Sequence, residues 1–330
     1  MKLIIQIPCF NEEETLRQTL DDLPMQIKDV DEIEYLVIND GSYDKTTAVA
    51  KEWGVNYIVN FTQNKGLAKG FMAGIDVALE NGADIIVNTD ADNQYCGKDI
   101  AKLIQPILEQ QADIVIGERP IDDTEDFSWL KKKLQRFGSW AVRQASNTNI
   151  PDAPSGFRAF SREAALRINV VNDYTYTLET IVQAGREKIP IVSVPVGTNK
   201  ALRPSRLART MFAYVRTSML TILRAYLVYK PLKAFLFISI FPTMPAIIIW
   251  IRFLYFFFTV GGAGHIQSLI FACTMLIIGF VCVMIGILGD TICANRKILQ
   301  DVQYHTRKQY YDGVKLSEPR KREKCRIYYR

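Results

Sequence analysis

The feature that most constrains this chain is an apolar run followed at once by two aspartates, within residues 85–94. The run is β-branched and glycines bound the stretch, a pattern that predicts a buried central strand. Asp90 and Asp92 then stand where the strand ends, and in open α/β sheets ligands bind outside the carboxyl ends of the strands. Two carboxylates spaced this closely repel each other unless a cation joins them, so the stretch favours a metal and diphosphate site. A solvated acidic turn is the alternative, because Asp-x-Asp is common by itself.

Strand-like and helix-like segments alternate five times before residue 120. The expected strands are residues 2–8, 33–39, 55–59, the run at 85–87 and 113–117. This alternation predicts an α/β fold, with a mostly parallel sheet and helices on both faces. Residues 11–14 resemble a capping box, which predicts a helix from there to about residue 23. A helix over residues 128–147 and a last strand over 189–196 are expected further on.

Charge is divided sharply along the chain. Residues 1–196 hold 20 Lys and Arg against 30 Asp and Glu, whereas residues 197–330 hold 20 against 5. A basic half around an apolar segment favours anionic lipid over nucleic acid as the partner. Residues 1–200 are expected to form a catalytic domain that stays cytoplasmic, because no signal peptide opens the chain. Residues 201–230 mix arginines with apolar residues, which suits an interfacial amphipathic helix; a helix packed on the sheet is the alternative.

Two long apolar runs follow, at residues 231–259 and 267–290. Each exceeds the ~20 apolar residues that span a bilayer. Their short link has no Lys or Arg, while both outer ends are basic, so the positive-inside rule predicts a hairpin over residues 231–295 with both termini cytoplasmic. Residues 296–330 are expected to form a basic cytoplasmic tail. The chain would therefore be a multi-pass membrane protein with two spanning helices.

Five short motifs stand in order along the chain. They are Ile7-Pro8-Cys9-Phe10-Asn11-Glu12-Glu13, Asn39-Asp40-Gly41-Ser42, the loop at 64–70, Asp90-Ala91-Asp92-Asn93-Gln94, and Ser155-Gly156-Phe157-Arg158. Together they make residues 1–230 resemble the inverting family 2 glycosyltransferases of GT-A fold. The polyprenyl-phosphate branch, which includes dolichol-phosphate mannose synthase, is the closer match, and the two apolar helices suit it. That family often has leucine where this chain has Asn93.

The resemblance implies a donor site and a metal site at the strand ends. The residues implied to bind the nucleotide sugar are Pro8, Asn11, Glu12, Asp40, Lys69, Asp90 and Ala91. Asp92 and Gln94 would hold Mg²⁺ or Mn²⁺, and Asp92 would be catalytic through that ion. Lys65 and Lys69 stand at an expected helix start, where backbone N–H groups favour phosphate; a solvated basic turn is the alternative there.

The acceptor decides whether a base is needed. A hydroxyl acceptor must lose a proton, which Asp152 could take as the second catalytic candidate. A lipid phosphate is already an anion and needs positioning instead. Arginine recognises phosphate through two parallel hydrogen bonds, although each candidate could equally form a structural ion pair. The candidates for the lipid phosphate are Arg119, Arg136, Arg158 and Arg203, and Glu179 is a weaker candidate for the site.

The sequence therefore predicts a membrane-anchored inverting hexosyl- or N-acetylhexosaminyltransferase. It would move one sugar from a nucleotide diphosphate sugar, UDP-sugar favoured over GDP-sugar, to undecaprenyl or dolichyl phosphate at the cytoplasmic face. Transfer to a membrane hydroxyl such as diacylglycerol is one alternative, and a non-catalytic scaffold that retains the fold is another. Nucleic acid is not an expected partner, and a homo-oligomer is compatible with the sequence.

Overall fold

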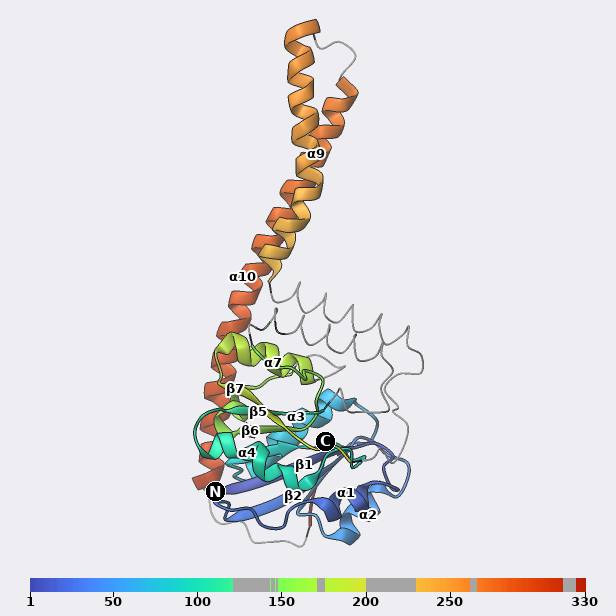
Figure 1. Ribbon diagram of the computed structural model, residues 1–330, viewed down its shortest axis with the longest axis vertical. Coiled ribbons are helices and arrows are strands. Elements are labelled where there is room, and N and C mark those ends of the chain that lie inside the picture. Colours follow the sequence, from blue (N-terminus) through green and yellow to red (C-terminus); the bar gives the residue numbers. More distant parts are fainter. Residues whose placement is uncertain are drawn as a thin grey trace. The chain divides into compact units, whose positions relative to one another are not determined.

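The computed structural model describes residues 1–120, 143, 146, 148–170, 176–199, 230–261, 266–316 and 325–330 (Figure 1). The chain divides into two compact units. The first consists of Met1–Arg216 and Gln300–Arg330, and the second of Thr217–Leu299. The helices expected over residues 128–147 and 201–230 lie almost wholly outside the described residues.

The first unit is built on a sheet with strand order β7-β5-β6-β4-β1-β2-β3-β8. The strands are β1 Lys2–Cys9, β2 Glu32–Asn39, β3 Tyr57–Asn60, β4 Ile85–Asn88, β5 Ile114–Glu118, β6 Arg158–Ser161, β7 Ile191–Pro195 and β8 Arg326–Tyr329. Strand β6 runs antiparallel to β4 and β5, and the other pairs are parallel. The expected mostly parallel α/β sheet is confirmed, with β4 and its two aspartates near the centre.

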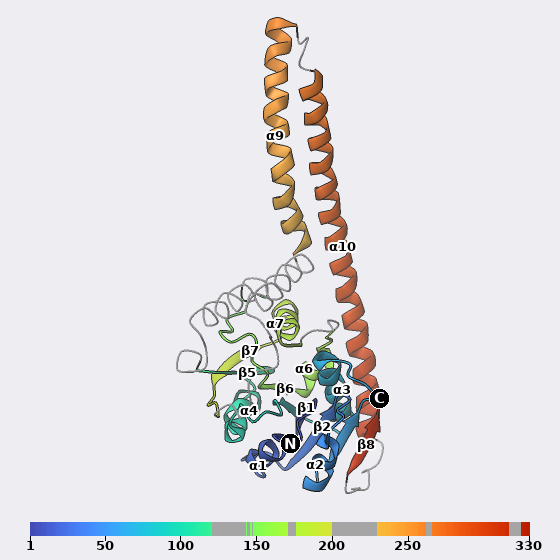
Figure 2. The same cartoon turned by 90° about the vertical axis from the view of Figure 1, so that its right-hand side faces the viewer.

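Helices cover both faces of this sheet (Figures 1 and 2). Alternate residues of β1, such as Leu3 and Ile5, join one core cluster with side chains of α1 Leu16–Asp22, α2 Thr46–Trp53 and α4 Ile100–Leu108, and the short helix η1 Gly97–Asp99 precedes α4. Among the described residues, the helices α3 Leu67–Glu80, α6 Arg162–Arg167 and α7 Tyr176–Glu187 lie on the opposite face. Since side chains of a strand alternate between the two faces, the apolar runs of β1 and β4 are buried on both sides.

The loop after β1 differs from the expected capping box. Helix α1 begins at Leu16, and the backbone oxygen of Glu12 accepts hydrogen bonds from the N–H groups of Thr15 and Leu16. Asn11 takes a left-handed conformation with φ of 54°, and its side chain binds the backbone of the loop after β2. The prediction of a helix that starts at residue 11 is therefore wrong, because Asn11 bridges two loops.

The second unit contains α9 Pro231–Val260 and the first part of α10 Ile266–Leu316, which run side by side (Figure 2). Both helices are long and apolar enough to cross a membrane, and only 17% of the most apolar window of each is buried. A side chain at Gly279 would meet Thr243, and one at Gly286 would meet Phe235, so small residues allow the two helices to approach closely. Two long apolar helices at the expected positions are confirmed.

The structure differs from the expectation of a separate basic tail over residues 296–330. Helix α10 continues to Leu316, and β8 pairs in parallel with β3. Residues 300–330 belong to the first unit. The basic composition of the segment did not reveal this arrangement, because its charged residues bind partners on α3 and α6 that are distant in the sequence. The Arg326–Tyr329 stretch is rich in the aromatic and β-branched residues that favour strands.

Candidate functional site

The loops after β1, β2 and β3 meet around Asp40. The N–H of Asp40 donates to the backbone oxygen of Cys9 at 2.9 Å. Its buried carboxylate accepts from the backbone N–H groups of Lys65 at 2.7 Å and Gly66 at 3.0 Å. Asp40 thus fixes the loop that opens α3, whose first turn carries the exposed Lys69. Its contact with a nucleotide stays a prediction, and the structure adds this positioning role.

Gly41 lets two of these loops touch. Its φ is +72°, a left-handed value, and a Cβ at this position would lie 2.4 Å from the backbone carbon of Gln63. Only glycine fits both the conformation and the space.

We expect Gly41→Ala to raise the KM for the donor about tenfold, because the added methyl must push the loop at 63–66 away from Asp40. Steady-state kinetics with varied donor concentration measure this. Gly54→Ala is the matched control, since Gly54 has a φ of +95° with nothing within 4 Å of its Cβ position. Equal effects of the two substitutions would show that backbone conformation alone matters, and would contradict the role given to the loop contact.

The residues after β1 are tied to the loop after β2. The N–H of Asn11 donates to Ser42 Oγ at 2.9 Å, and its side-chain oxygen accepts from the N–H of Tyr43 at 3.0 Å. Glu12 is buried, and its carboxylate accepts from Thr15 Oγ1 at 2.8 Å. Pro8 lies half-buried at the end of β1. The structure therefore brings the predicted donor-binding residues of the first two motifs to one edge of the sheet.

Asp90 and Asp92 follow β4 at the same edge. Burial and the nearby Asp92 carboxylate raise the pKa of Asp90 to about 7, against the opposing charges of Arg119 and Arg158. Among the described residues no group of three or more His, Cys, Asp or Glu side chains could hold a metal ion. Two mutually repelling carboxylates fit a divalent cation whose other ligands are diphosphate oxygens and water, which is how Mg²⁺ is usually held.

The turn that carries these aspartates is held from both sides. Thr19 Oγ1 of α1 donates to the backbone oxygen of Ala91 at 2.9 Å. The N–H of Gln94, the second predicted metal ligand, donates to Asp92 Oδ1 at 3.2 Å. Asn93 has a φ of 55°, and Asn199 donates to its backbone oxygen at 3.1 Å. Asparagine tolerates this left-handed conformation better than leucine does, which gives a physical reason for Asn93 here.

Gly156 and Tyr95 belong to the site, although the sequence did not assign them a role. A Cβ at Gly156 would lie 2.8 Å from Asp90 Oδ1 and 2.9 Å from Oδ2. The N–H of Gly156 donates to the hydroxyl of Tyr95 at 3.1 Å, and the Tyr95 ring stacks on Phe157 with centroids 4.9 Å apart. The glycine of the Ser155–Arg158 motif was the available signal, because a backbone that must approach another group closely calls for glycine.

Arg119 and Asp152 form an ion pair beside the two aspartates. Arg119 Nε donates to Asp152 Oδ2 at 2.7 Å, and Nη2 donates to Oδ1 at 3.0 Å. Asp152 is fully buried, and the Arg119 side chain is 12% exposed. A carboxylate whose two oxygens accept from a guanidinium is poorly placed to take a proton from a substrate, whereas it holds the arginine firmly in one orientation.

Arg158 does not agree with its predicted role as a lipid-phosphate ligand. Its side chain is fully buried, and its guanidinium donates to the backbone oxygens of Ser155, Ala153 and Thr177 and to Thr180 Oγ1. Burial lowers its pKa to about 10. Arg158 organises the segment around Gly156 and joins it to α7. Glu179 is buried on α7, while Arg136 and Arg203 lie outside the described residues.

Comparison of the sequence with known proteins identifies a matching family and named relatives. The model of the family described as Glycosyl transferase family 2 matches residues 4–168. The chain is 31% identical over 217 residues to UDP-N-acetylglucosamine–dolichyl-phosphate N-acetylglucosaminyltransferase of Methanococcus voltae, a match that covers 58% of this chain and 83% of that protein. It is 25% identical over 223 residues to polyprenol monophosphomannose synthase of Mycolicibacterium smegmatis, covering 63% and 81%.

A solved structure shares the fold. Glucosyl-3-phosphoglycerate synthase from Mycobacterium tuberculosis, crystallised with Mn²⁺, UDP-glucose and phosphoglyceric acid, aligns with a TM-score of 0.52 at 19% identity, over 67% of this chain and 79% of that one. At this level of identity the likeness concerns the fold alone.

Proposed function

Because the chain belongs to glycosyl transferase family 2, we propose that it transfers one sugar from a nucleoside diphosphate sugar to a polyprenyl phosphate. The observation that carries the proposal is the meeting of Asp90, Asp92, Gly156 and Arg119 at the carboxyl end of β4, in a chain with two helices apolar enough to cross a membrane. The two relatives named above by sequence identity carry the names of a dolichyl-phosphate N-acetylglucosaminyltransferase and a polyprenol monophosphomannose synthase.

The donor would lie across the ends of β1, β2 and β4. Asp40 would face the nucleoside, while Lys65 and Lys69 at the start of α3 offer positive charge and a helix N-terminus to the diphosphate. We favour a UDP-sugar over a GDP-sugar. The N-acetylglucosaminyltransferase of Methanococcus voltae, whose name gives a UDP-sugar as donor, supports that preference.

Asp92 and Gln94 would hold Mg²⁺ or Mn²⁺, with Asp90 beside them. A bound divalent ion supplies a Lewis acid that neutralises the negative charge of the leaving diphosphate. Asp90 and Asp92 supply the negative charge that such an ion needs. The Gly156 backbone lies against Asp90 and keeps that carboxylate in place.

The acceptor would be a lipid phosphate. One of its oxygens attacks the anomeric carbon, the bond from that carbon to the diphosphate oxygen breaks, and the electron pair leaves with the nucleoside diphosphate. The anomeric centre inverts. No proton has to be removed, because the phosphate is already an anion, which is consistent with an Asp152 engaged by Arg119. Arg119 would orient the acceptor through the part of its guanidinium outside that pair.

The membrane arrangement follows from the same proposal. The helices α9 and α10 would form a hairpin through the bilayer, with the first unit on the cytoplasmic face. Residues 1–200 would be the catalytic domain and residues 201–230 an interfacial helix.

A donor screen tests the reaction. The full-length protein in detergent with Mn²⁺ is given UDP- and GDP-sugars, with and without undecaprenyl or dolichyl phosphate, and release of nucleoside diphosphate is measured. Release that depends on the lipid phosphate is the expected result. Release that does not depend on lipid, or release only with a diacylglycerol acceptor, would overturn the proposed acceptor.

Asp152→Asn separates positioning from base catalysis. We expect kcat to fall by about tenfold, with the shape of the pH–rate profile retained, because the amide holds Arg119 less firmly but no catalytic proton is lost. The measurement is kcat with lipid phosphate across about pH 5–9, a range that spans the pKa of a catalytic base working near neutral pH. Complete loss of activity, or loss of an ionisation from the profile, would support Asp152 as a base and a hydroxyl acceptor.

A further inference from the structure

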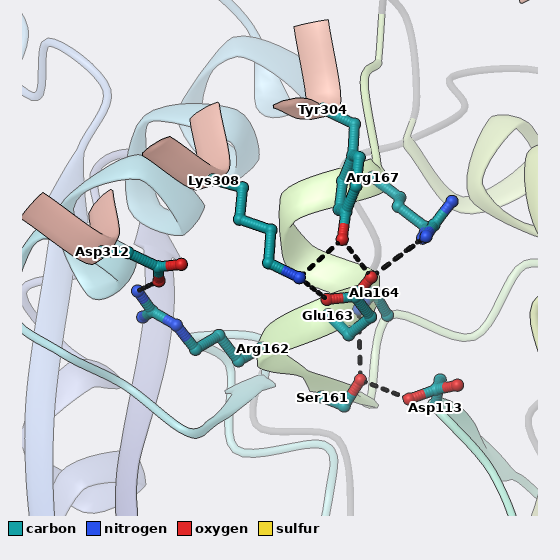
Figure 3. Close-up of polar contacts among 9 residues, drawn as sticks. All are labelled: Asp113, Ser161, Arg162, Glu163, Ala164, Arg167, Tyr304, Lys308 and Asp312. Atoms are coloured by element: carbon teal, nitrogen blue, oxygen red, sulfur yellow. Dashed lines mark hydrogen bonds and ion pairs between the residues drawn. The ribbon is translucent and has the colours of Figure 1, made fainter. Parts of the chain in front are cut away.

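The end of helix α10 binds α6 through the half-buried carboxylate of Glu163. Glu163 Oε1 accepts from the hydroxyl of Tyr304 and from Arg167 Nη2 at 3.0 Å, and Glu163 Oε2 lies 3.5 Å from Lys308 Nζ (Figure 3). Lys308 also donates to the Tyr304 hydroxyl at 2.9 Å. Burial raises the pKa of Glu163, but the hydrogen bonds from Tyr304 and Arg167 and the Lys308 charge outweigh it and hold the pKa below its usual value. Glu163 is therefore held as a carboxylate by Tyr304 and Lys308 of α10 together with Arg167 of its own helix.

A second carboxylate binds the same helix to α3. Asp76 Oδ1 accepts from Arg307 Nη2 at 2.8 Å and from the hydroxyl of Tyr311 at 3.1 Å. Asp76 Oδ2 accepts from Arg330 Nη1 at 3.3 Å. Arg307 Nη1 donates in addition to the backbone oxygen of Ile168 at 2.9 Å. One aspartate thus holds both the end of α10 and the residue that follows β8.

We call the set formed by Asp76, Glu163, Tyr304, Arg307, Lys308 and Tyr311 the C-terminal clasp. Its four members on α10 are spaced i, i+3, i+4 and i+7, which places them on one face of the helix. Tyr304 and Tyr311 are 8% and 6% exposed. Apolar packing alone leaves a helix free to rotate or slide by small amounts, whereas directional charged hydrogen bonds fix its rotation and register. The clasp therefore fixes the position of the end of α10 on α3 and α6.

Each helix of the clasp leads to another part of the protein. Before residue 300, α10 carries the apolar stretch that is long enough to cross a membrane. Helix α3 begins at the loop that Asp40 holds, and α6 follows β6, which begins at the Arg158 of the Ser155–Arg158 motif. We propose that the C-terminal clasp is the link by which the membrane-anchored helix positions the catalytic unit for an acceptor that sits in the bilayer. This inference rests on the proposed function.

The test compares a bilayer-bound acceptor with a soluble one. The full-length protein is reconstituted in vesicles, and the double variant Asp76→Asn with Glu163→Gln removes the two negative charges of the clasp while it keeps oxygen acceptors. Transfer is measured to undecaprenyl phosphate in the vesicles and to a water-soluble ten-carbon polyprenyl phosphate. Glu80→Gln is the control, because Glu80 is on α3 one turn from Asp76 and its carboxylate accepts a weak 3.5 Å hydrogen bond from Tyr310.

We expect kcat/KM to fall about tenfold or more with undecaprenyl phosphate and to change little with the soluble acceptor, with the donor KM unchanged. The control variant should match the wild type with both acceptors. Equal losses with the two acceptors would show a structural role, and unchanged activity with both would show no role; either result overturns the inference. Failure of the wild type with both acceptors would instead contradict the proposed function.

Discussion

Replacement of Asp92 by asparagine is expected to lower kcat by roughly 100- to 1000-fold, the loss that follows when one group that stabilises developing charge is removed. Burial, together with repulsion from the Asp92 carboxylate, raises the pKa of Asp90 to about 7. Without the Asp92 charge the pair attracts a divalent ion less, so the negative charge on the leaving diphosphate is less well neutralised. Steady-state turnover at several Mn²⁺ concentrations measures the loss.

The control for this variant is Asp84→Asn. Asp84 precedes the same strand, and its carboxylate accepts from the N–H of Lys2 at 2.8 Å at the opposite end of the sheet. We expect its kcat and its Mn²⁺ dependence to stay near those of the wild type. Treatment with EDTA should abolish wild-type activity, and added Mn²⁺ or Mg²⁺ should restore it. An Asp92→Asn protein with full activity and an unchanged response to metal would remove the metal site from the proposal.

Gly156→Ala is the substitution with the second largest expected effect, about 100-fold in kcat/KM. The added Cβ would lie 2.8 Å from Asp90 Oδ1, so the carboxylate or the loop must move by some tenths of an ångström, and misplacement of about 1 Å in a positioned group can cost 100-fold in rate. The variant should fold, because a single methyl group at the end of β4 leaves the core of the sheet untouched.

Gly313→Ala is the matched substitution. Gly313 lies near the end of α10 with nothing within 4 Å of its Cβ position, and alanine favours the helix there. We expect it to keep wild-type kinetics. The donor KM and the circular dichroism spectrum of Gly156→Ala show whether the donor loop and the fold are intact. Wild-type kinetics in Gly156→Ala would mean that the approach of this backbone to Asp90 does not matter for turnover.

The central sheet could be predicted from local pattern. Runs such as Ile85–Asn88 are apolar and β-branched, they alternate with amphipathic helices, and the polar motifs stand directly after them. Because parallel strands end at one edge of their sheet, residues from distant motifs had to meet there. Asp40, Asp90 and Asp92 lie at that edge as expected, although their contacts with a donor stay predictions.

Contacts between distant residues could not be predicted in the same way. The arginine at 158 reads as a phosphate ligand, yet it is buried against backbone oxygens, and only the path of the chain around it decides this. The pairing of Arg119 with Asp152 joined two residues that the sequence had assigned to separate tasks. The sequence predicted a basic tail for the end of α10, because the partners of its charged residues on α3 and α6 are distant in the sequence and are brought near only by the fold.

The place of β8 in the sheet bears on how the protein is made. β8 pairs with β3, so residues 326–329 add the edge strand next to residues 57–60, and the two apolar helices lie between these strands in the chain. During synthesis the edge of β3 stays without its partner strand β8 until both apolar helices have left the ribosome. An exposed strand edge invites pairing with other chains, and pairing over such a long separation is slow. On the proposed membrane arrangement, insertion of the two apolar helices and completion of the sheet are therefore expected to be coupled in time, and a fragment cut before residue 230 would keep an open edge at β3.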